Sequence, residues 1–382
     1  MAMIKVLVLF GGRSGEHEVS LASARSVLAA LDPARYQIIQ VGIDHDGAWL
    51  YSPGPESTLE RMEKGDRSGL QSVFLSPAPS GGKLYIMPAY PDAGMDPAGL
   101  RLLAEVDVVF PVLHGTLGED GTLQGFLELA DLAYVGAGVL GSSVGMDKAL
   151  FKDVMRAHGI PVVESLLVLR SEIEQDLEAV MKRAEALAPY PLFVKPANLG
   201  SSVGISKCAN RSDLVEGLLE AGRFDRRLLV ERGLNAREIE VSVLGNEQPQ
   251  ASIPGEVIPS REFYSYESKY LDGTSGLLIP APISDADAAK VHRLALQAYQ
   301  AMDCAGMARV DFLLEKALPG REPRLYLNEL NTIPGFTRIS MYPKLWDASG
   351  LPYAALIDRL IDLALARKAE RDQTERRFKV DR

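Results

Sequence analysis

Short apolar runs alternate with amphipathic stretches along the N-terminal part of the chain. The first run, Ile4 to Phe10, is apolar throughout and ends at two glycines, which is typical of a buried parallel strand followed by a turn. Apolar residues then recur at helical spacing from Glu16 to Leu31, and a second strand is expected from Tyr36 to Ile43. A further strand and helix are expected from Val106 to Val112 and from Gly121 to Asp131. This order predicts an α/β fold with an open parallel sheet at the N-terminus.

The pattern changes twice further along the chain. A helix from Asp147 to His158 opens a second region of short strands and charged helices, and beyond residue 232 the strands are typical of a mostly antiparallel sheet. This gives the C-terminal part α+β character, with a final helix from Tyr353 to Ala366 and a charged end that is expected to fray. The segment 44–100 is rich in Gly, Pro and Ser and is assigned no chemistry. The predicted units are domains at 1–140, 141–231 and 232–367 and a tail at 368–382.

Composition narrows the class of protein. The 382 residues, 47% hydrophobic and 24% charged, fit a globular protein of two or three domains. A formal net charge of −10 argues against general nucleic-acid binding, because a phosphate backbone attracts basic surfaces. The two cysteines cannot form a disulfide framework, and no apolar run reaches the roughly 18 residues that a membrane span requires. We therefore expect a cytoplasmic protein that binds neither nucleic acid nor membrane.

A lysine followed by a glycine- and serine-rich loop is the strongest local signal for chemistry. An apolar strand from Leu192 delivers Lys195, and the loop from Gly200 to Gly204 then offers backbone N–H and hydroxyl donors before a short strand. Such donors beside a lysine are suited to a phosphate group. The loop lacks the Gly-Lys-Ser/Thr run that opens a helix in a P-loop, so it predicts a different class of nucleotide site.

A second glycine pattern is a weaker signal. Residues Gly136 to Gly141 fit GxGxxG, but they lie far from the first strand, and the helix that they should open is expected only near Met146. No acidic residue ends a strand about 20 residues on, as a ribose contact requires. A turn that links two domains is the preferred interpretation.

Two predicted strands carry polar side chains in otherwise apolar surroundings. Residues two apart on a strand face the same side, so Arg309 shares a face with Asp311, and Glu329 shares one with Asn331. Charged groups in such strands are costly unless they are paired or bound to metal. If the strands are neighbours, these oxygen ligands suit Mg²⁺. The alternative is a structural ion pair between Arg309 and Glu329.

Several acidic residues have both a functional and an ordinary interpretation. Glu231 and Glu238 flank a polar turn and could accept hydrogen bonds from an adenine amino group and ribose hydroxyls, or could be solvated loop carboxylates. Glu16 and Glu18 lie where the first strand meets a helix, a place where ligands bind in open α/β sheets. They could accept a bond from a substrate ammonium, or simply stabilise the start of the helix.

Two basic features complete the candidate set. Lys148 opens a predicted helix and is by default a surface lysine, but together with Lys195 and Lys269 it could neutralise a triphosphate. Lys269 belongs to the segment Arg261 to Tyr270, which combines three tyrosines and a lysine between two strands. A lid that closes over a site is the interpretation that we favour.

These segments together resemble the ATP-grasp superfamily and, within it, the D-alanine–D-alanine ligases. The motifs that carry the resemblance are, in chain order, GGRSGEHEVSL, LHGTLGEDGTLQG, GSSVGMDK, VKPANLGSSVGISK, FYSYESKY, ARVDF and NELNTIPGFT. The resemblance as a whole extends over about residues 4–366. The resemblance implies a three-domain ATP-grasp fold with ATP held between two sheets. It also implies ligation of two D-alanines at the expense of ATP for peptidoglycan precursors, and a homodimer.

Residue roles follow from the matched motifs as implications of the resemblance. The catalytic residues would be Glu16, Ser201, Tyr270, Arg309 and Gly335, the first three as a hydrogen-bonded triad and the last two as an oxyanion hole. D-Alanine would contact Val19, His114, Ser340 and Met341. ATP would contact Lys148, Lys195, Ser202, Glu231, Leu234, Glu238 and Lys269. Two Mg²⁺ or Mn²⁺ ions would be held by Asp311, Glu329 and Asn331.

Alternatives to dipeptide formation remain open. In the related D-alanine–D-lactate ligases the lid has a different sequence with a histidine at its tip, whereas this chain has Lys269 followed by Tyr270. The resemblance therefore favours the dipeptide-forming branch over a D-alanine–D-lactate or D-alanine–D-serine ligase. A non-catalytic protein that binds ATP or D-alanine on the same fold is a further alternative, against which the intact set of Arg309, Asp311, Glu329 and Asn331 argues.

Overall fold

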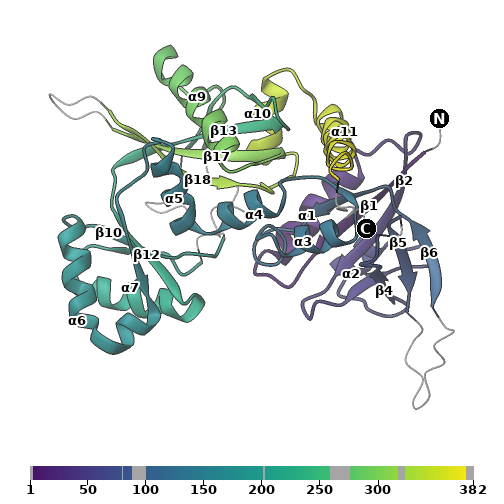
Figure 1. Ribbon diagram of the computed structural model, residues 1–382, viewed down its shortest axis with the longest axis horizontal. Coiled ribbons are helices and arrows are strands. Elements are labelled where there is room, and N and C mark those ends of the chain that lie inside the picture. The colour runs from purple at the N-terminus through teal and green to yellow at the C-terminus, as the bar shows by residue number, and fades with distance from the viewer. Residues whose placement is uncertain are drawn as a thin grey trace, which may run out of the picture.

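The computed structural model describes residues 3–79, 81–87, 100–200, 203–258, 276–316 and 323–375. Three sheets with their helices follow one another along the chain, and the N-terminal sheet lies on the right of Figure 1 with the other two on the left. Within the described ranges, no helix is both long and apolar enough to cross a membrane.

The N-terminal domain is built on an eight-stranded sheet in the order β6-β5-β4-β3-β2-β1-β7-β8. Strands β2, β1, β7 and β8 are parallel, as predicted, while β3 to β6 continue the sheet in antiparallel pairs. The antiparallel part comes from the segment after β2, in which each strand pairs with the next one along the chain. The elements are β1 (Ile4–Gly11), α1 (His17–Leu28), β2 (Tyr36–Ile43), β3 (Trp49–Tyr51), α2 (Thr58–Glu63), β4 (Gln71–Leu75), β5 (Lys83–Ile86), β6 (Arg101–Glu105), β7 (Val108–Val112), α3 (Thr122–Leu129) and β8 (Ala133–Tyr134).

The central part is a four-stranded antiparallel sheet, β11-β10-β12-β9, covered on one face by α6 and α7. Leu192 and Val194 of β10 point into the core under these helices, so Lys195 points to the opposite face. The elements are α4 (Val139–Met146), α5 (Lys148–Ala157), β9 (Ser165–Leu169), α6 (Arg170–Leu187), β10 (Leu192–Pro196), β11 (Ser206–Cys208), α7 (Arg211–Phe224) and β12 (Arg227–Arg232).

Helix α4 corrects one detail of the sequence analysis. It begins at Val139, directly after Gly138, and not near Met146 as expected. A Cβ atom at Gly141 would lie 3.1 Å from Cys304 Sγ, and one at Gly145 would lie 3.1 Å from Met302 Cε. These glycines therefore allow α4 to pack closely on the C-terminal domain. The last glycine of the GxGxxG pattern, Gly141, is therefore explained by helix packing.

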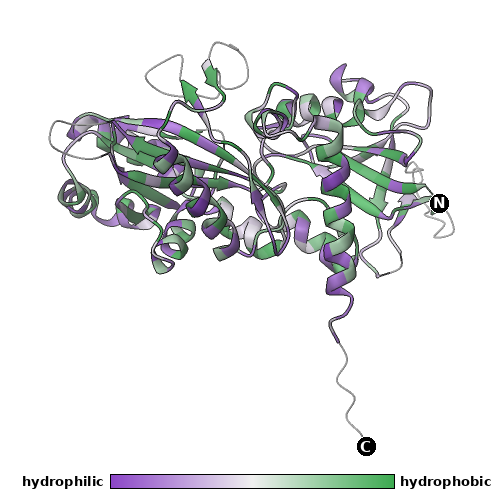
Figure 2. Cartoon of the chain, turned by 90° about the horizontal axis from the view of Figure 1, so that it is seen from above, coloured by the Kyte–Doolittle hydropathy of each residue, from purple (hydrophilic) through white to green (hydrophobic). Residues whose placement is uncertain are grey.

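The C-terminal part is a six-stranded sheet with the path β16-β15-β13-β17-β18 and β14 paired to β13. One face packs on α9, with Ile239, Val241 and Val310 in a shared core, and the other face is polar. The elements are β13 (Ala236–Gly245), β14 (Gln250–Ala251), β15 (Gly255–Ile258), β16 (Gly276–Leu278), α9 (Asp285–Ala301), β17 (Gly306–Glu315), β18 (Leu325–Asn331), α10 (Met341–Ala348) and α11 (Tyr353–Arg371). In Figure 2 the strands of the sheets are largely green, as expected for strands buried beneath helices.

Helix α11 joins the C-terminal part to the N-terminal domain. Leu356 and Leu360 pack in one core with Val6 and Phe110 of the N-terminal sheet. The helix continues to Arg371, five residues beyond its predicted end at Ala366, so the expectation that residues 367 onward fray is wrong up to Arg371. The extension is stable because its basic side chains bond to the N-terminal domain.

Arg367 is the residue of this extension with the most specific contacts. Its guanidinium donates to the carbonyl oxygens of Gly136 and Tyr134, and its carbon Cζ lies 4.3 Å from the centre of the Tyr134 ring. A partly buried guanidinium that satisfies two carbonyls and stacks on an aromatic ring contributes both hydrogen bonds and a cation–π interaction.

Replacing this side chain tests the contribution of α11 to stability. We expect Arg367→Ala to lower the free energy of unfolding by about 2 kcal/mol, because two hydrogen bonds and the ring contact are lost. Urea denaturation measures the change. Arg359→Ala, at an exposed position of the same helix, is the matched control and should stay within about 0.5 kcal/mol of the wild type. Equal effects of the two substitutions would contradict the assigned role.

Candidate functional site

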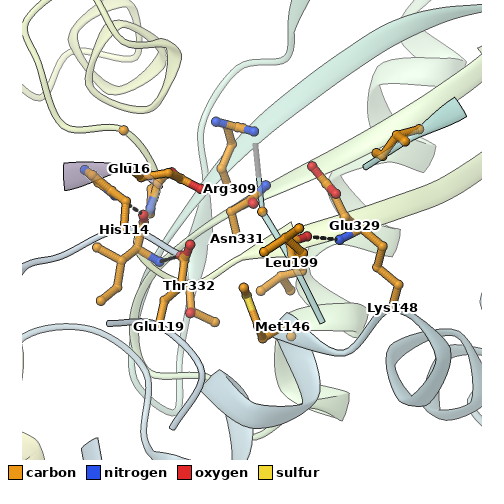
Figure 3. A pocket seen from close by; sticks show the side chains of 17 residues that line it. Glu16, His114, Glu119, Met146, Lys148, Leu199, Arg309, Glu329, Asn331 and Thr332 are labelled. Atoms are coloured by element: carbon orange, nitrogen blue, oxygen red, sulfur yellow. Dashed lines mark hydrogen bonds between the residues drawn. The ribbon is translucent and has the colours of Figure 1, made fainter. Parts of the chain in front are cut away.

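A narrow cavity of about 80 Å³ lies where the three parts of the chain meet (Figure 3). The N-terminal domain contributes Glu16, His114 and Glu119, the central part contributes Lys148 and Leu199, and the C-terminal sheet contributes Arg309, Glu329 and Asn331. The predicted residues of these three regions therefore converge on one site.

The polar face of the six-stranded sheet forms one wall of the site. Strands β17 and β18 are adjacent and antiparallel, with Asp311 opposite Glu329 and Arg309 opposite Asn331. Arg309 donates from Nε to Asp311 Oδ1 at 2.8 Å and from Nη2 to Asp311 Oδ2 at 2.6 Å, and Asn331 Nδ2 donates to Asp311 Oδ2 at 3.0 Å. The prediction that the two strands are neighbours is confirmed. The alternative drawn from the sequence was an ion pair between Arg309 and Glu329, but in the structure Arg309 pairs with Asp311.

Glu240 is a member of this face that the sequence analysis missed. It lies opposite Asp311 on β13, its side chain is buried, and its Oε2 is 3.0 Å from Arg309 Nε. Burial alone would lower the pKa of Arg309, but the charges of Asp311 and Glu240 raise that pKa well above its ordinary value. The alternation of Glu238 and Glu240 in β13 is the sequence signal that could have revealed it.

The donor set on this face suits divalent cations. The described strands β13, β17 and β18 turn four carboxylates, Glu238, Glu240, Asp311 and Glu329, to the same side as the single guanidinium of Arg309. Such an excess of carboxylate oxygens, with the amide of Asn331 beside them, matches the hard oxygen ligands that Mg²⁺ or Mn²⁺ prefers. Asp311, Glu329 and Asn331 are therefore able to hold a metal.

The central sheet forms the opposite wall. Lys195 of β10 and Glu231 of β12 share a face, with Lys195 Nζ 2.6 Å from Glu231 Oε2. Burial by itself would lower the pKa of Lys195, but the charge of Glu231 outweighs it, and Glu329 and Glu238 of the other sheet raise the pKa further. Lys195 therefore lies within electrostatic reach of both walls.

The glycine-rich loop reaches the N-terminal domain. A Cβ on Gly200 would lie 2.5 Å from Glu16 Oε1, and one on Gly115 would lie 3.2 Å from the same oxygen, so both backbones approach the carboxylate more closely than a larger residue permits. Lys148 Nζ donates to Leu199 O at 2.6 Å and holds the start of this loop. The loop thus connects Lys148 to Glu16.

His114 connects the N-terminal domain to the loop after β18. Its Nδ1 lies 3.0 Å from Ile333 O, which can only accept, so Nδ1 carries the proton. Its Nε2 then accepts from Ser23 Oγ at 3.0 Å, and Ser23 Oγ in turn accepts from the N–H of Phe336 at 3.4 Å. Burial lowers the pKa of His114, which favours this neutral form. Both ring nitrogens hold the backbone on either side of Gly335.

Glu119 is a second residue that the sequence analysis missed. It lies in the LHGTLGEDGTLQG motif, lines the cavity, and accepts from the N–H of Gly115 at 2.8 Å and of Ile333 at 3.3 Å. Burial, assisted by the charge of Glu16, raises the pKa of Glu119 to about 8. Its carboxyl is therefore largely protonated at neutral pH.

The remaining predicted residues lie around the cavity or outside the described ranges. Val19 is buried in α1, Leu234 and Glu238 are partly buried at the start of β13, and Ser340 Oγ is 3.2 Å from the position of a Cβ on Gly335. Met341 packs with Val257 and Leu345. Ser201, Ser202, Lys269 and Tyr270 lie outside the residues that the structure describes.

The pKa of Glu119 predicts a pH-dependent contribution to stability. A carboxyl whose pKa rises from 4.5 to about 8 on folding stabilises the folded state fully below pH 4.5 and loses that contribution as the pH rises to about 8. We therefore expect the free energy of unfolding of the wild type to fall between pH 5 and pH 8 relative to that of Glu119→Gln. Urea denaturation across this range measures the difference, with exposed Glu174→Gln as the control that should run parallel to the wild type. A constant difference between wild type and Glu119→Gln would show that Glu119 is ionised throughout.

Comparisons with known sequences cover nearly the whole chain. The family profile described as D-ala D-ala ligase N-terminus matches residues 5–137, and the one described as D-ala D-ala ligase C-terminus matches residues 154–362. The chain is 47% identical over 380 residues to a D-alanine–D-alanine ligase of Natranaerobius thermophilus, covering 99% of each chain. It is 51% identical over 362 residues to one of Thermoanaerobacter sp., covering 94% of this chain and 96% of the relative.

Solved structures agree with the sequence comparisons. The D-alanine–D-alanine ligase of Coxiella burnetii superposes with a TM-score of 0.81 at 37% identity and covers 98% of this chain and 97% of its own. The VanG D-Ala:D-Ser ligase of Enterococcus faecalis superposes with a TM-score of 0.81 at 34% identity, covering 95% and 100%. These neighbours have the ATP-grasp fold, which is therefore also the fold of this chain. By its sequence over nearly its full length, by its fold and by the residues that meet at its domain junction, the chain belongs to the D-alanine–D-alanine ligase family.

Proposed function

We propose that the chain is an ATP-dependent D-alanine–D-alanine ligase that makes the dipeptide for peptidoglycan precursors. The observation that carries the proposal is the meeting of three kinds of group in one cavity. The cavity is lined by Glu16, an acceptor for an ammonium, by Lys148, a positive charge for phosphates, and by Arg309 beside the carboxylates of the C-terminal sheet. Lys195 lies outside the lining, in the neighbouring central sheet, where it pairs with Glu231.

The reaction has two steps. The carboxylate of the first D-alanine attacks the γ-phosphorus of ATP, which forms an acyl phosphate and releases ADP. The amine of the second D-alanine, after losing a proton, attacks the acyl carbon, and the tetrahedral intermediate expels phosphate. Positioning and charge stabilisation dominate such a reaction, because negative charge is spread over the transferring phosphoryl group and the reacting atoms must be brought into line.

Glu16 fits the role of holding the first D-alanine. It is buried at the start of α1, and the close approach of Gly115 and Gly200 leaves its carboxylate facing the cavity. An ammonium bound there would place the substrate carboxylate between the two walls of the site. Ser201 and Tyr270 would join Glu16 in the proposed triad.

Arg309 and the N–H of Gly335 fit the role of stabilising the oxyanion. Arg309 is fixed by Asp311 and Glu240, and the loop that carries Gly335 is fixed by His114 and Ser23. We infer that His114 acts by holding this loop, since both of its ring nitrogens are already bonded. Donors that are fixed before the reaction need no reorganisation when charge develops.

Two Mg²⁺ or Mn²⁺ ions at Asp311, Glu329 and Asn331 would neutralise the transferring phosphoryl group. Lys148 and Lys195 would bind the phosphates from the opposite wall, and Glu231, Leu234 and Glu238 would hold the nucleoside. The cavity of about 80 Å³ is far smaller than the several hundred Å³ of a typical ligand pocket, so we infer that the two walls separate to admit the nucleotide. We further propose that the enzyme is a homodimer and that it is cytoplasmic. Analytical ultracentrifugation of the purified protein tests the dimer.

Acceptor competition tests the proposed function. With ATP, Mg²⁺, D-alanine and equal D-lactate or D-serine, we expect D-alanyl-D-alanine to be the main product at neutral and higher pH, because the attacking amine must be unprotonated. Mass spectrometry of the products from pH 6 to 9 gives the ratio of D-alanyl-D-alanine to the product of the competing acceptor. Depsipeptide or D-alanyl-D-serine as the main product would favour the alternative ligases, and no phosphate release would favour a non-catalytic binding protein.

Glu329→Gln tests the metal ligands. We expect turnover to fall by about a hundredfold and the Mg²⁺ requirement to rise, because an amide oxygen replaces a charged ligand. Phosphate release at a series of Mg²⁺ concentrations measures both. Glu315→Gln, a partly buried glutamate of β17 that pairs with Arg232, is the control and should keep wild-type turnover. Wild-type turnover and Mg²⁺ requirement in Glu329→Gln would place the metal elsewhere.

A further inference from the structure

Lys152 is a buried lysine that neither the motifs nor the proposed mechanism explain. It lies in α5, one helical turn after Lys148, and its side chain is 1% exposed. Residues four apart on a helix share a face, so α5 directs both lysines toward the nucleotide wall of the site. A lysine with this burial is rare unless it is paired, which indicates a specific role.

The partner of Lys152 is Glu231. Lys152 Nζ lies 2.8 Å from Glu231 Oε1, while Lys195 Nζ lies 2.6 Å from Glu231 Oε2. One buried carboxylate is therefore shared by two ammonium groups, one on each oxygen. Glu231 belongs to β12 and Lys195 to the adjacent β10, whereas Lys152 approaches from a helix.

The three groups differ in their freedom to move. Lys152 and Glu231 are 1% and 4% exposed, but Lys195 is 14% exposed and lies within the field of Glu329 and Glu238. Burial would raise the pKa of Glu231, but the two lysines lower it to about 2, while burial lowers the pKa of Lys152. The lowered pKa of Glu231 favours an ionised pair, whereas the lowered pKa of Lys152 favours a neutral one. The ionised pair fits the geometry better, because two ammonium groups lie within 3 Å of the Glu231 carboxylate. Glu231 therefore stays ionised.

We propose that Lys152 is a positioning residue of the nucleotide site: it remains paired with Glu231 and so allows Lys195 to leave that carboxylate for the phosphates of the incoming nucleotide. Without Lys152, the departure of Lys195 would leave a buried carboxylate with no counter-charge, which is strongly unfavourable. With Lys152 in place, the exchange leaves Glu231 neutralised, and its Oε2 becomes available as an acceptor. The inference rests on the proposed function, in which Lys195 and Glu231 contact ATP.

Lys152→Met tests the proposal, because it keeps most of the side-chain volume and removes the charge. We expect the Kd for ADP with Mg²⁺ to rise about tenfold by isothermal titration calorimetry, and the KM for ATP to rise by the same factor. We expect kcat at saturating ATP and the KM for D-alanine to stay within about twofold, because the reacting groups are untouched. Lys182→Met, at a position with a side chain that is 72% exposed, is the matched control and should bind ADP as the wild type does.

A second variant separates this role from support of the fold. In Lys152→Met/Glu231→Gln the carboxylate charge is also removed, so Lys195 is free, and we expect ADP affinity within about threefold of that of Glu231→Gln alone. This comparison holds even if Lys152→Met does not fold. ADP binding by Lys152→Met at wild-type affinity would overturn the proposal, as would an equal tenfold loss in the double variant relative to Glu231→Gln. If the wild type itself does not bind ADP, or does not release phosphate with ATP and D-alanine, the result contradicts the proposed function and not only the role of Lys152.

Discussion

The structure depends on keeping buried carboxylates neutralised where two sheets face each other. Each sheet has one face covered by helices and one polar face, because side chains alternate along a strand. The polar faces bring Glu231 from one sheet and Glu240 and Asp311 from the other into buried positions, with the partly buried Glu329 beside them. A buried charge without a partner is costly, so this arrangement exists only with cations between the sheets. In the described part of the chain, Lys152, Lys195 and Arg309 supply that charge.

The site is completed at the junctions between domains. The N-terminal domain is linked to the C-terminal sheet by His114, which bonds to Ile333, and by α11, whose Arg367 bonds to backbone of the N-terminal domain. The central part is linked to both by α5 and by the loop at Gly200, which packs against Glu16. A relative shift of these parts of the chain would separate all of these groups together.

The residues that could be predicted from the sequence are those whose local pattern is unusual. Polar residues in apolar strands revealed Arg309, Asp311 and Glu329, and a lysine before a glycine-rich loop revealed Lys195. The neighbour relation of β17 and β18 then followed and is confirmed. Glu119, Glu240 and Lys152 were missed, because a glutamate in a loop, a second acid in a strand and a lysine in a helix are ordinary in sequence. Only their surroundings make them unusual, because Glu240 and Lys152 are buried and Glu119 accepts from the N–H groups of Gly115 and Ile333, and these surroundings are a property of the packed chain.

The sequence by itself determined the main order of strands and helices, the parallel part of the N-terminal sheet, the glycine-rich loop after Lys195 and the polar faces of the strands, since each depends on the spacing of residues close together in the chain. The tertiary structure decided which partner each charge has. Arg309 pairs with Asp311 and Glu240, Glu231 with two lysines, and residues 367–371 remain helical against the N-terminal domain. These choices join residues far apart in sequence, and their energies depend on the loss of water when three domains close on one another, which no local pattern records.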